Sequence, residues 1–212
     1  MDDVDPRARS ALIGPPQEIA PALLGGELAS DLGDRVRVRI TEVEAYAGIG
    51  QDPGSHAHRR RTQRNATMFG PAGHAYVYFT YGMPWCLNVV VHPEGEAGAV
   101  LIRAGEVTEG LAVARGRRPA SRADRDLARG PARLATALGV TGDQDGIDLL
   151  DPRGPLRLTL GATPVGPATI ATGPRTGVAG DGAPTPWRFW LDDPTVSRHR
   201  PATRPGSARA RH

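Results

Sequence analysis

The stretch "ITEVEAYAG" (residues 40–48) places two carboxylates within a pattern typical of a strand. If side chains alternate regularly from Val36, Glu44 falls on the same face as the apolar positions. That face consists of Val36, Val38, Ile40, Glu42, Glu44 and Tyr46. A carboxylate in a protein interior must be paired, hydrogen-bonded or protonated, because burial disfavours its charged form. Enzymes prepare general bases and acids in this way, so Glu44 is a candidate for acid–base chemistry.

Two further polar residues interrupt apolar runs. Arg103 ends "GAVLIR", and Asn88 lies within "WCLNVVVH". If the strands that carry Glu44 and Arg103 are neighbours, their charged groups meet inside a cleft and are placed to hold a water molecule. The alternative for Arg103 is a structural ion pair, because buried charges usually occur in pairs. The alternative for Asn88 is a side chain that ties down a loop.

Aromatic residues gather in one part of the chain. Of the ten in the sequence, seven lie between residues 46 and 85, namely Tyr46, Phe69, Tyr76, Tyr78, Phe79, Tyr81 and Trp85. The stretch between Tyr46 and Phe69 carries Arg59, Arg60, Arg61 and Arg64. Aromatic platforms beside arginine clusters are a feature of nucleic-acid binding, and Tyr81, directly before Gly82 at a turn, is placed to wedge between stacked bases. The alternatives are an aromatic mini-core of one hairpin and a solvated loop.

Missing residue types exclude several chemistries. All 26 basic side chains are arginines, so the chain has no lysine for a phosphate-binding P-loop or for an imine, and only the terminal amine of Met1 is left for imine chemistry. Cys86 is the single cysteine, which excludes a disulfide framework and a cysteine-based zinc site. His56 and His58 have no third ligand at a convincing spacing. We therefore expect no metal and no organic cofactor.

The length of 212 residues fits one domain, which we place at 17–194. Residues 1–16 are predicted to form a flexible arm, and 195–212 a basic, disordered tail. The start of the chain is polar and no apolar run approaches membrane-spanning length, so we expect a cytoplasmic protein without a membrane partner. We also expect a monomer.

The residue pattern predicts an α+β fold with a mostly antiparallel sheet. Helices are expected near Ile19–Leu28, at 107–116 and at 131–138. Strands are expected at Val36–Tyr46, 74–81, 85–92, 98–103, 155–160 and 186–191. Residues 51–73 are predicted to form a long ordered loop, a length that usually indicates function or disorder.

Three strings in this order, E-A-Y-x-G, R-N-x-x-M-F and Y-V-Y-x-x-Y-G-M-x-x-x-x-N, resemble the 3-methyladenine (alkyladenine) DNA glycosylase family. The similarity runs from about Ile19 to about Leu191. It implies a single compact domain with a curved sheet flanked by helices and a protruding β-hairpin that intercalates into DNA. It also implies a monofunctional hydrolase that starts base excision repair on double-stranded DNA. Such an enzyme flips alkylated or deaminated purines (3-methyladenine, 7-methylguanine, ethenoadenine or hypoxanthine) and hydrolyses their N-glycosidic bonds.

The resemblance also implies a role for each candidate residue. Glu44 corresponds to the general base that activates water, and Arg103 to the arginine that helps to hold that water. Tyr81 corresponds to the wedge that replaces the extruded nucleotide, and the four loop arginines are expected on the DNA backbone. The side chains expected around the flipped base are Tyr46, His56, Tyr78 and Asn88.

Two other functions stay open. A non-catalytic damage-binding protein on the same fold would share the aromatic residues and the arginines but would not need Glu44 and Arg103. A structural or RNA-binding domain, such as the formyltransferase carboxy-terminal domains of similar fold, would show no preference for damaged DNA. The joint presence of the candidate residues disfavours both.

Overall fold

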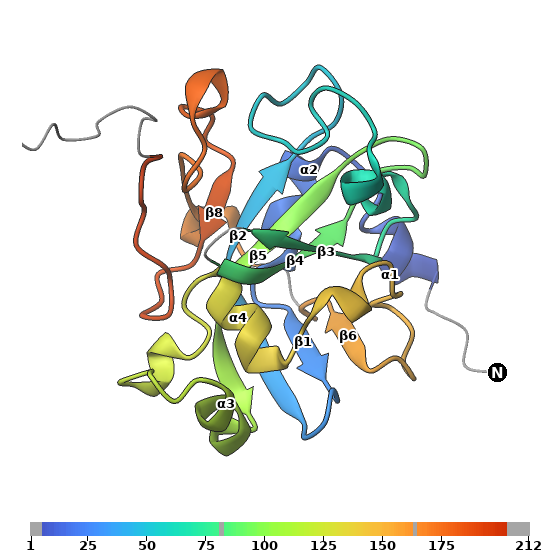
Figure 1. Ribbon diagram of the computed structural model, residues 1–212. Helices are drawn as coiled ribbons and strands as arrows, with labels where there is room; N and C mark the ends of the chain where they lie inside the picture. Colours follow the sequence, from blue (N-terminus) through green and yellow to red (C-terminus); the bar gives the residue numbers. More distant parts are fainter. Residues whose placement is uncertain (1–5, 81–82, 163–164, 203–212) are drawn as a thin grey trace, which may run out of the picture.

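The computed structural model describes residues 6–80, 83–162 and 165–202. In these ranges the chain forms one compact α+β domain around an open antiparallel sheet (Figure 1), which confirms the predicted fold class. The strands are β1 (Glu27–Ser30), β2 (Val36–Tyr46), β3 (Ala75–Thr80), β4 (Met83–Val90), β5 (Ala99–Glu109), β6 (Leu156–Thr159), β7 (Ala171–Gly173) and β8 (Arg188–Trp190). The α-helices are α1 (Pro6–Ser10), α2 (Pro16–Ile19), α3 (Leu111–Arg117) and α4 (Pro131–Leu138).

The sheet brings the two strands of the sequence-predicted site together. Its strand order is β3-β4-β5-β2-β1-β6, so β2 and β5 are neighbours, and β8 pairs with β2 over Glu42–Glu44 while also pairing with β7. Helix α4 packs on β4 and β5 and lies across the sheet in Figure 1. Leu134 and Leu138 of this helix are fully buried in the main apolar core. The main core thus occupies one face of the sheet, and the other face carries a smaller apolar cluster, which includes Tyr76 and Val90, beside polar side chains.

The alternation predicted for β2 is wrong at its second half. Val36, Val38 and Ile40 lie in the main core, but so do Val43 and Ala45, which have the opposite parity. The register with β5 shifts between Ile40 and Glu42, where β2 carries one extra residue. Such a bulge reverses which face each later side chain takes, and bulges often re-aim side chains beside active sites.

The bulge explains where the carboxylates of β2 point. Arg39 and Thr41, before it, contact Asp193 and Thr195 of the C-terminal segment. After it, Glu42 contacts Ser197 of the same segment. Glu42 and Glu44 therefore project away from the main core, where Ser197 covers Glu42 and the loop of Thr176 covers Glu44.

Two predicted helices differ from the observed elements. The helix near Ile19–Leu28 is instead α2, a 3-10 turn (Ala20–Leu23) and then strand β1. Gly25 adopts a left-handed φ of 77°, which ends the helical stretch. A Cβ at Gly26 would lie 2.8 Å from the backbone oxygen of Thr159, so glycine at this position allows the close contact with β6. The helix expected at 107–116 begins only at Leu111, because β5 continues to Glu109.

The other predicted elements are confirmed with small changes in their ends. The helix at 131–138 is α4, and the strands at 74–81, 85–92, 98–103, 155–160 and 186–191 correspond to β3, β4, β5, β6 and β8. Strands β1 and β7 were not predicted. The loop at 51–73 contains a 3-10 helix, Gln63–Phe69. Tyr81 and Gly82 lie outside the described residues, so the protruding hairpin stays a prediction.

The described parts of the two chain ends contact the domain. Leu12 is fully buried, and Arg9 forms an ion pair of 2.6 Å with Asp148. At the other end Thr195 is buried, and Ser197 donates its backbone N–H to Glu42. The domain limits of 17 and 194 stay a prediction, but packed residues extend beyond both.

Candidate active site

Glu44 is fully buried, and polar groups from three directions bind its carboxylate. Its Oε2 accepts hydrogen bonds from the Tyr46 hydroxyl at 2.9 Å and from Nη1 of Arg103 at 3.1 Å. Its Oε1 accepts the backbone N–H of Thr176 at 2.6 Å. A carboxylate oxygen has two lone pairs, so Oε1 keeps one acceptor position beyond these bonds. The arrangement is suited to an ionised carboxylate with room for one further donor.

Arg103 lies on β5 and bridges two carboxylates of β2. Its Nε donates to Oε1 of Glu42 at 3.0 Å, while Nη1 reaches Glu44. Burial lowers the pKa of this guanidinium, but Glu44 and Glu42 outweigh that effect and raise the pKa above its usual value. Arg103 is therefore a permanent positive charge beside Glu44.

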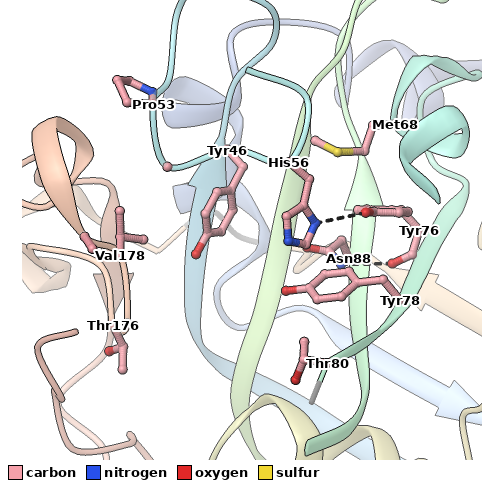
Figure 2. A pocket seen from close by; sticks show the side chains of 13 residues that line it. Tyr46, Pro53, His56, Met68, Tyr76, Tyr78, Thr80, Asn88, Thr176 and Val178 are labelled. Carbon is pink, nitrogen blue, oxygen red and sulfur yellow. Dashed lines mark hydrogen bonds between the residues drawn. The ribbon is translucent and has the colours of Figure 1, made fainter. Parts of the chain in front are cut away.

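An aromatic pocket of about 380 Å³ opens next to Glu44 and Arg103. Figure 2 shows Tyr46 on one side and His56, Tyr76 and Tyr78 gathered opposite, with the loop of Thr176 and Val178 closing a further side. The rings of His56 and Tyr78 meet edge to face at a centroid distance of 4.6 Å. A pocket of this size with mostly flat walls fits a small aromatic ligand.

The amide of Asn88 lies deeper in the same pocket. Its Nδ2 donates to the backbone oxygen of Tyr76 at 2.9 Å, so β3, the neighbouring strand, holds the amide in place. His56 Nδ1 lies 3.1 Å from the Tyr76 hydroxyl. These bonds, drawn in Figure 2, fix two polar groups within an otherwise aromatic wall.

The titratable groups of the pocket walls are neutral near pH 7. Burial raises the pKa of Tyr46 well above its usual value, and the nearby Glu44 charge adds to the effect. Burial likewise raises the pKa of Tyr78. Burial lowers the pKa of His56, and the charge of Arg64 lowers it further. Glu44 is thus surrounded on the pocket side by uncharged rings.

The loop that carries His56 is held by two buried polar side chains. Asn65, of the R-N-x-x-M-F string, donates to the backbone oxygens of His56 and Arg60 at 2.9 and 3.1 Å. Asp52 forms a two-point ion pair with Arg175, with distances of 2.6 and 2.7 Å. The Arg175 guanidinium also lies 4.7 Å from the centroid of the Tyr46 ring. The loop and the pocket wall are therefore fixed together.

The four loop arginines, Arg59, Arg60, Arg61 and Arg64, are all exposed, and we call them the arginine loop. Arg64 donates to the backbone oxygen of Phe79 at 3.1 Å and lies 5.9 Å from the ring centroid of Tyr78. Among the described residues, no carboxylate forms an ion pair with any of the four. Their charges are available to an external anion beside the pocket.

The comparisons with known proteins agree on one family. A model of the methylpurine-DNA glycosylase family matches residues 10–195. This chain belongs to the methylpurine-DNA glycosylase family. Its relatives include proteins of Streptomyces avermitilis (54% identity, covering 95% of each chain) and Nocardia farcinica (53%, covering 94% of this chain and 95% of the relative). Both are provisionally named 3-methyladenine DNA glycosylase.

Membership of the methylpurine-DNA glycosylase family confirms the resemblance read from the three sequence strings. DNA glycosylases are hydrolases of N-glycosyl bonds and bind damaged DNA, so repair by base excision is the class of function for this chain. Within the described ranges no helix is long and apolar enough to cross a membrane. The same ranges hold no group of three or more His, Cys, Asp or Glu arranged as a metal site.

The structure brings most of the sequence-predicted residues of this glycosylase together. The pocket is lined by Tyr46, His56, Tyr78 and Asn88, and Arg103 contacts Glu44 at its edge. Glu44 itself is not part of the lining but is reached through the Tyr46 hydroxyl and the Thr176 N–H. The wedge residue Tyr81 lies outside the described residues. The functional role of each residue stays a prediction.

Sequence reasoning missed the partners that come from the C-terminal third. Arg175 and Arg188 are buried arginines, yet nothing in their local pattern distinguishes them from the many exposed ones. Arg175 lies in "PRTGV" (174–178) and Arg188 in "WRFWL" (187–191), and neither stretch indicates which carboxylate its arginine binds. The partner carboxylates lie more than a hundred residues earlier in the chain.

Proposed function

We propose that this protein is a monofunctional DNA glycosylase that flips alkylated or deaminated purines out of duplex DNA and hydrolyses their N-glycosidic bonds. Substrates would include 3-methyladenine and 7-methylguanine, and also ethenoadenine or hypoxanthine. The single observation that carries the proposal is the Glu44 carboxylate, bound by Arg103 at the edge of an aromatic pocket. The monomeric state and the location in the cytoplasm stay predictions.

Base flipping follows from the position of the pocket. Glu44 is fully buried and is bound by Tyr46 and Thr176 of the pocket wall, so a base within the DNA stack cannot reach it without leaving the duplex. Tyr81 would fill the gap left by the flipped nucleotide, and the arginine loop would bind the flanking phosphates. Tyr46 would stack on one face of the base, and one of the two nearly perpendicular rings of His56 and Tyr78 would stack on the other face.

Hydrolysis requires a water at the free acceptor position of Glu44 Oε1. Glu44 would take a proton from this water as its oxygen attacks the sugar C1′, and the electron pair of the N-glycosidic bond would leave with the purine. Purines alkylated at N3 or N7 carry a positive charge and depart as neutral bases. Neutral lesions need a proton on the leaving base from a group that we do not assign.

The absence of lysine limits the product. No side-chain amine exists to form an imine with the sugar, so the strand should stay intact with an abasic site. Borohydride should therefore trap no covalent adduct between the protein and the DNA. A trapped adduct would contradict the monofunctional assignment.

The proposal is tested by single-turnover release of base from a duplex that carries one ethenoadenine or one 7-methylguanine. The native protein should leave an alkali-labile site, and Glu44→Gln should bind the duplex but release base about 10² to 10⁴ times more slowly. Glu106→Gln, which changes a half-exposed carboxylate of β5, should keep the native rate. If native protein and Glu44→Gln both bind damaged DNA and neither releases base, the protein is a damage-binding protein.

A further inference from the structure

Two carboxylates and two guanidinium groups form a compact cluster behind the pocket. Glu42, Glu44, Arg103 and Arg188 are each at most 6% exposed, and we call them the charge cluster. Glu42 Oε1 accepts from Arg103 Nε at 3.0 Å and from Arg188 Nε at 2.6 Å. Only Glu44 and Arg103 have a part in the hydrolysis proposed above. Glu42 and Arg188 therefore require a separate explanation.

Ser197 joins the cluster from the C-terminal segment. Its backbone N–H and its hydroxyl both donate to Glu42, at 2.7 and 3.0 Å. Its backbone oxygen accepts from Arg188 Nη2 at 2.7 Å, and its Oγ lies 3.3 Å from Arg103 Nη2. Ser197 thus contacts three of the four charged groups.

The formal charges of the cluster cancel. Arg103 is shared between Glu42 and Glu44, so one guanidinium alone would leave one negative charge without compensation. Arg188 supplies the second positive charge through Glu42. In a buried site, the loss of any one charge changes the electrostatic energy of the other three charged groups, because water does not screen their interactions.

The remaining groups that face the cluster are neutral or already paired. Burial raises the pKa values of Tyr46, Tyr78 and Cys86, which keeps all three protonated. Arg175 lies near Tyr46 and Glu44 but is balanced by Asp52. The net charge around Glu44 is therefore controlled by Glu42, Arg103 and Arg188.

We propose that Glu42, Arg188 and Ser197 are positioning residues that hold Arg103 on Glu44 and fix the pH range in which Glu44 is ionised. The inference rests on the proposed function, because it assigns these residues to the same hydrolysis. It goes beyond that function by making the C-terminal segment part of the acid–base site. None of the three residues needs to touch the DNA.

The test is the pH dependence of single-turnover base release from a duplex with one 7-methylguanine. This lesion is already cationic and needs no leaving-group proton, so loss of rate at low pH reports the base alone. The acid limb of the pH–rate profile is the range in which the rate falls as the pH falls. Glu42→Gln removes a negative charge beside Glu44, which favours ionised Glu44 and should move this acid limb to lower pH. Arg188→Gln removes a positive neighbour and should move the limb to higher pH. Each shift should be on the order of one pH unit.

Two further variants separate charge from packing. The double variant Glu42→Gln, Arg188→Gln keeps the cluster neutral and should return the limb close to its native position. Ser197→Ala keeps every charge, so it should lower the rate without moving the limb. The surface pair of Arg115 and Asp124, outside the charge cluster, supplies matched charge controls, and Arg115→Gln and Asp124→Asn should leave the profile unchanged.

The outcomes distinguish this inference from the proposed function. If the native protein releases no base at any pH, the proposed function fails before the variants are compared. If the native protein is active and the two single variants shift the limb in the same direction or not at all, the charge-balance role is overturned. Opposite shifts, with the double variant near native, support it even where the absolute rates fall.

Discussion

Asp52→Asn should strongly destabilise the protein, although it replaces one oxygen by an amide nitrogen. The Asp52 carboxylate accepts four hydrogen bonds, two from Arg175 and one each from the N–H groups of Ala47 and Gly54. An amide at this position places an NH₂ group against at least one donor and removes the counter-charge of Arg175. The guanidinium cannot reach water, since its side chain has no exposed surface.

The expected magnitude follows from that burial. Removing one partner of a buried ion pair typically costs about 3 to 5 kcal/mol, because the other charge stays buried without compensation. For a chain of this length each kcal/mol corresponds to about 2 to 4 °C in Tm, so the midpoint should fall by roughly 6 to 20 °C. Thermal unfolding followed by circular dichroism, repeated in urea, measures the loss.

Asp124→Asn is the matched control, because Asp124 pairs with Arg115 in a comparable two-point contact at the surface. It should leave Tm unchanged within error. Adding Arg175→Met to Asp52→Asn removes the uncompensated charge and should recover part of the loss. If Asp52→Asn were no more destabilising than Asp124→Asn, burial would not determine the strength of this pair and the reasoning would be refuted.

Three further predictions concern the pocket and the DNA-binding surface. In Gly54→Ala the new Cβ would lie 2.7 Å from both Arg175 Nη2 and Val178 Cγ1. Urea unfolding should therefore show a free energy of unfolding that is lower by about 1 to 3 kcal/mol. Gly116→Ala, which adds a Cβ in open space on α3, should not destabilise the protein. The pKa of His56 should lie below the usual 6.5 in an NMR pH series, because burial and the charge of Arg64 lower it. The unfolded chain binds this proton more readily than the folded protein does. The stability that neutral His56 contributes should therefore be complete above pH 6.5 and should be lost as the pH falls towards the folded-state pKa. An unshifted His56 signal would contradict this. Each arginine of the arginine loop changed to alanine should reduce the slope of log K against log salt for duplex DNA by about 1, and an unchanged slope would remove that residue from the DNA contact.

The sequence predicted the fold class and several side chains that the structure brings together at the pocket, but not the direction in which the carboxylates of β2 point. Period-two alternation placed Glu44 on the core face of β2, whereas the bulge between Ile40 and Glu42 places it on the opposite face. No glycine or proline within β2 marks this bulge, although Gly105 of β5 pairs with Ile40 directly beside it. The prediction that Glu44 is buried was nevertheless right, because the loop of Thr176 covers the face to which it was moved.

Sequence patterns identified Arg103 as a buried arginine but not Arg175 and Arg188. The chain has 26 arginines; the surroundings of Arg175 resemble those of exposed ones, and the aromatic stretch "WRFWL" around Arg188 did not indicate a partner for it. Burial of such a residue depends on a carboxylate supplied from elsewhere in the fold, Asp52 for Arg175 and Glu42 for Arg188. Each arginine lies more than a hundred residues from its carboxylate in the sequence. Neither helix nor strand periodicity can relate residues so far apart, so only the three-dimensional structure identifies the pairs.

These long-range contacts determine how the candidate site is completed. The pocket wall opposite Tyr46 comes from one continuous stretch, since His56, Tyr76, Tyr78 and Asn88 all lie within residues 56–88. The carboxylate side depends on the C-terminal third, because Thr176 binds Glu44 and both Arg188 and Ser197 bind Glu42. A chain that ended before residue 175 would lose Arg175, which holds the His56 loop through Asp52, together with the groups that cover Glu42 and Glu44. The aromatic side and the carboxylate side of the pocket thus come from different parts of the sequence, and packing of the C-terminal third joins them.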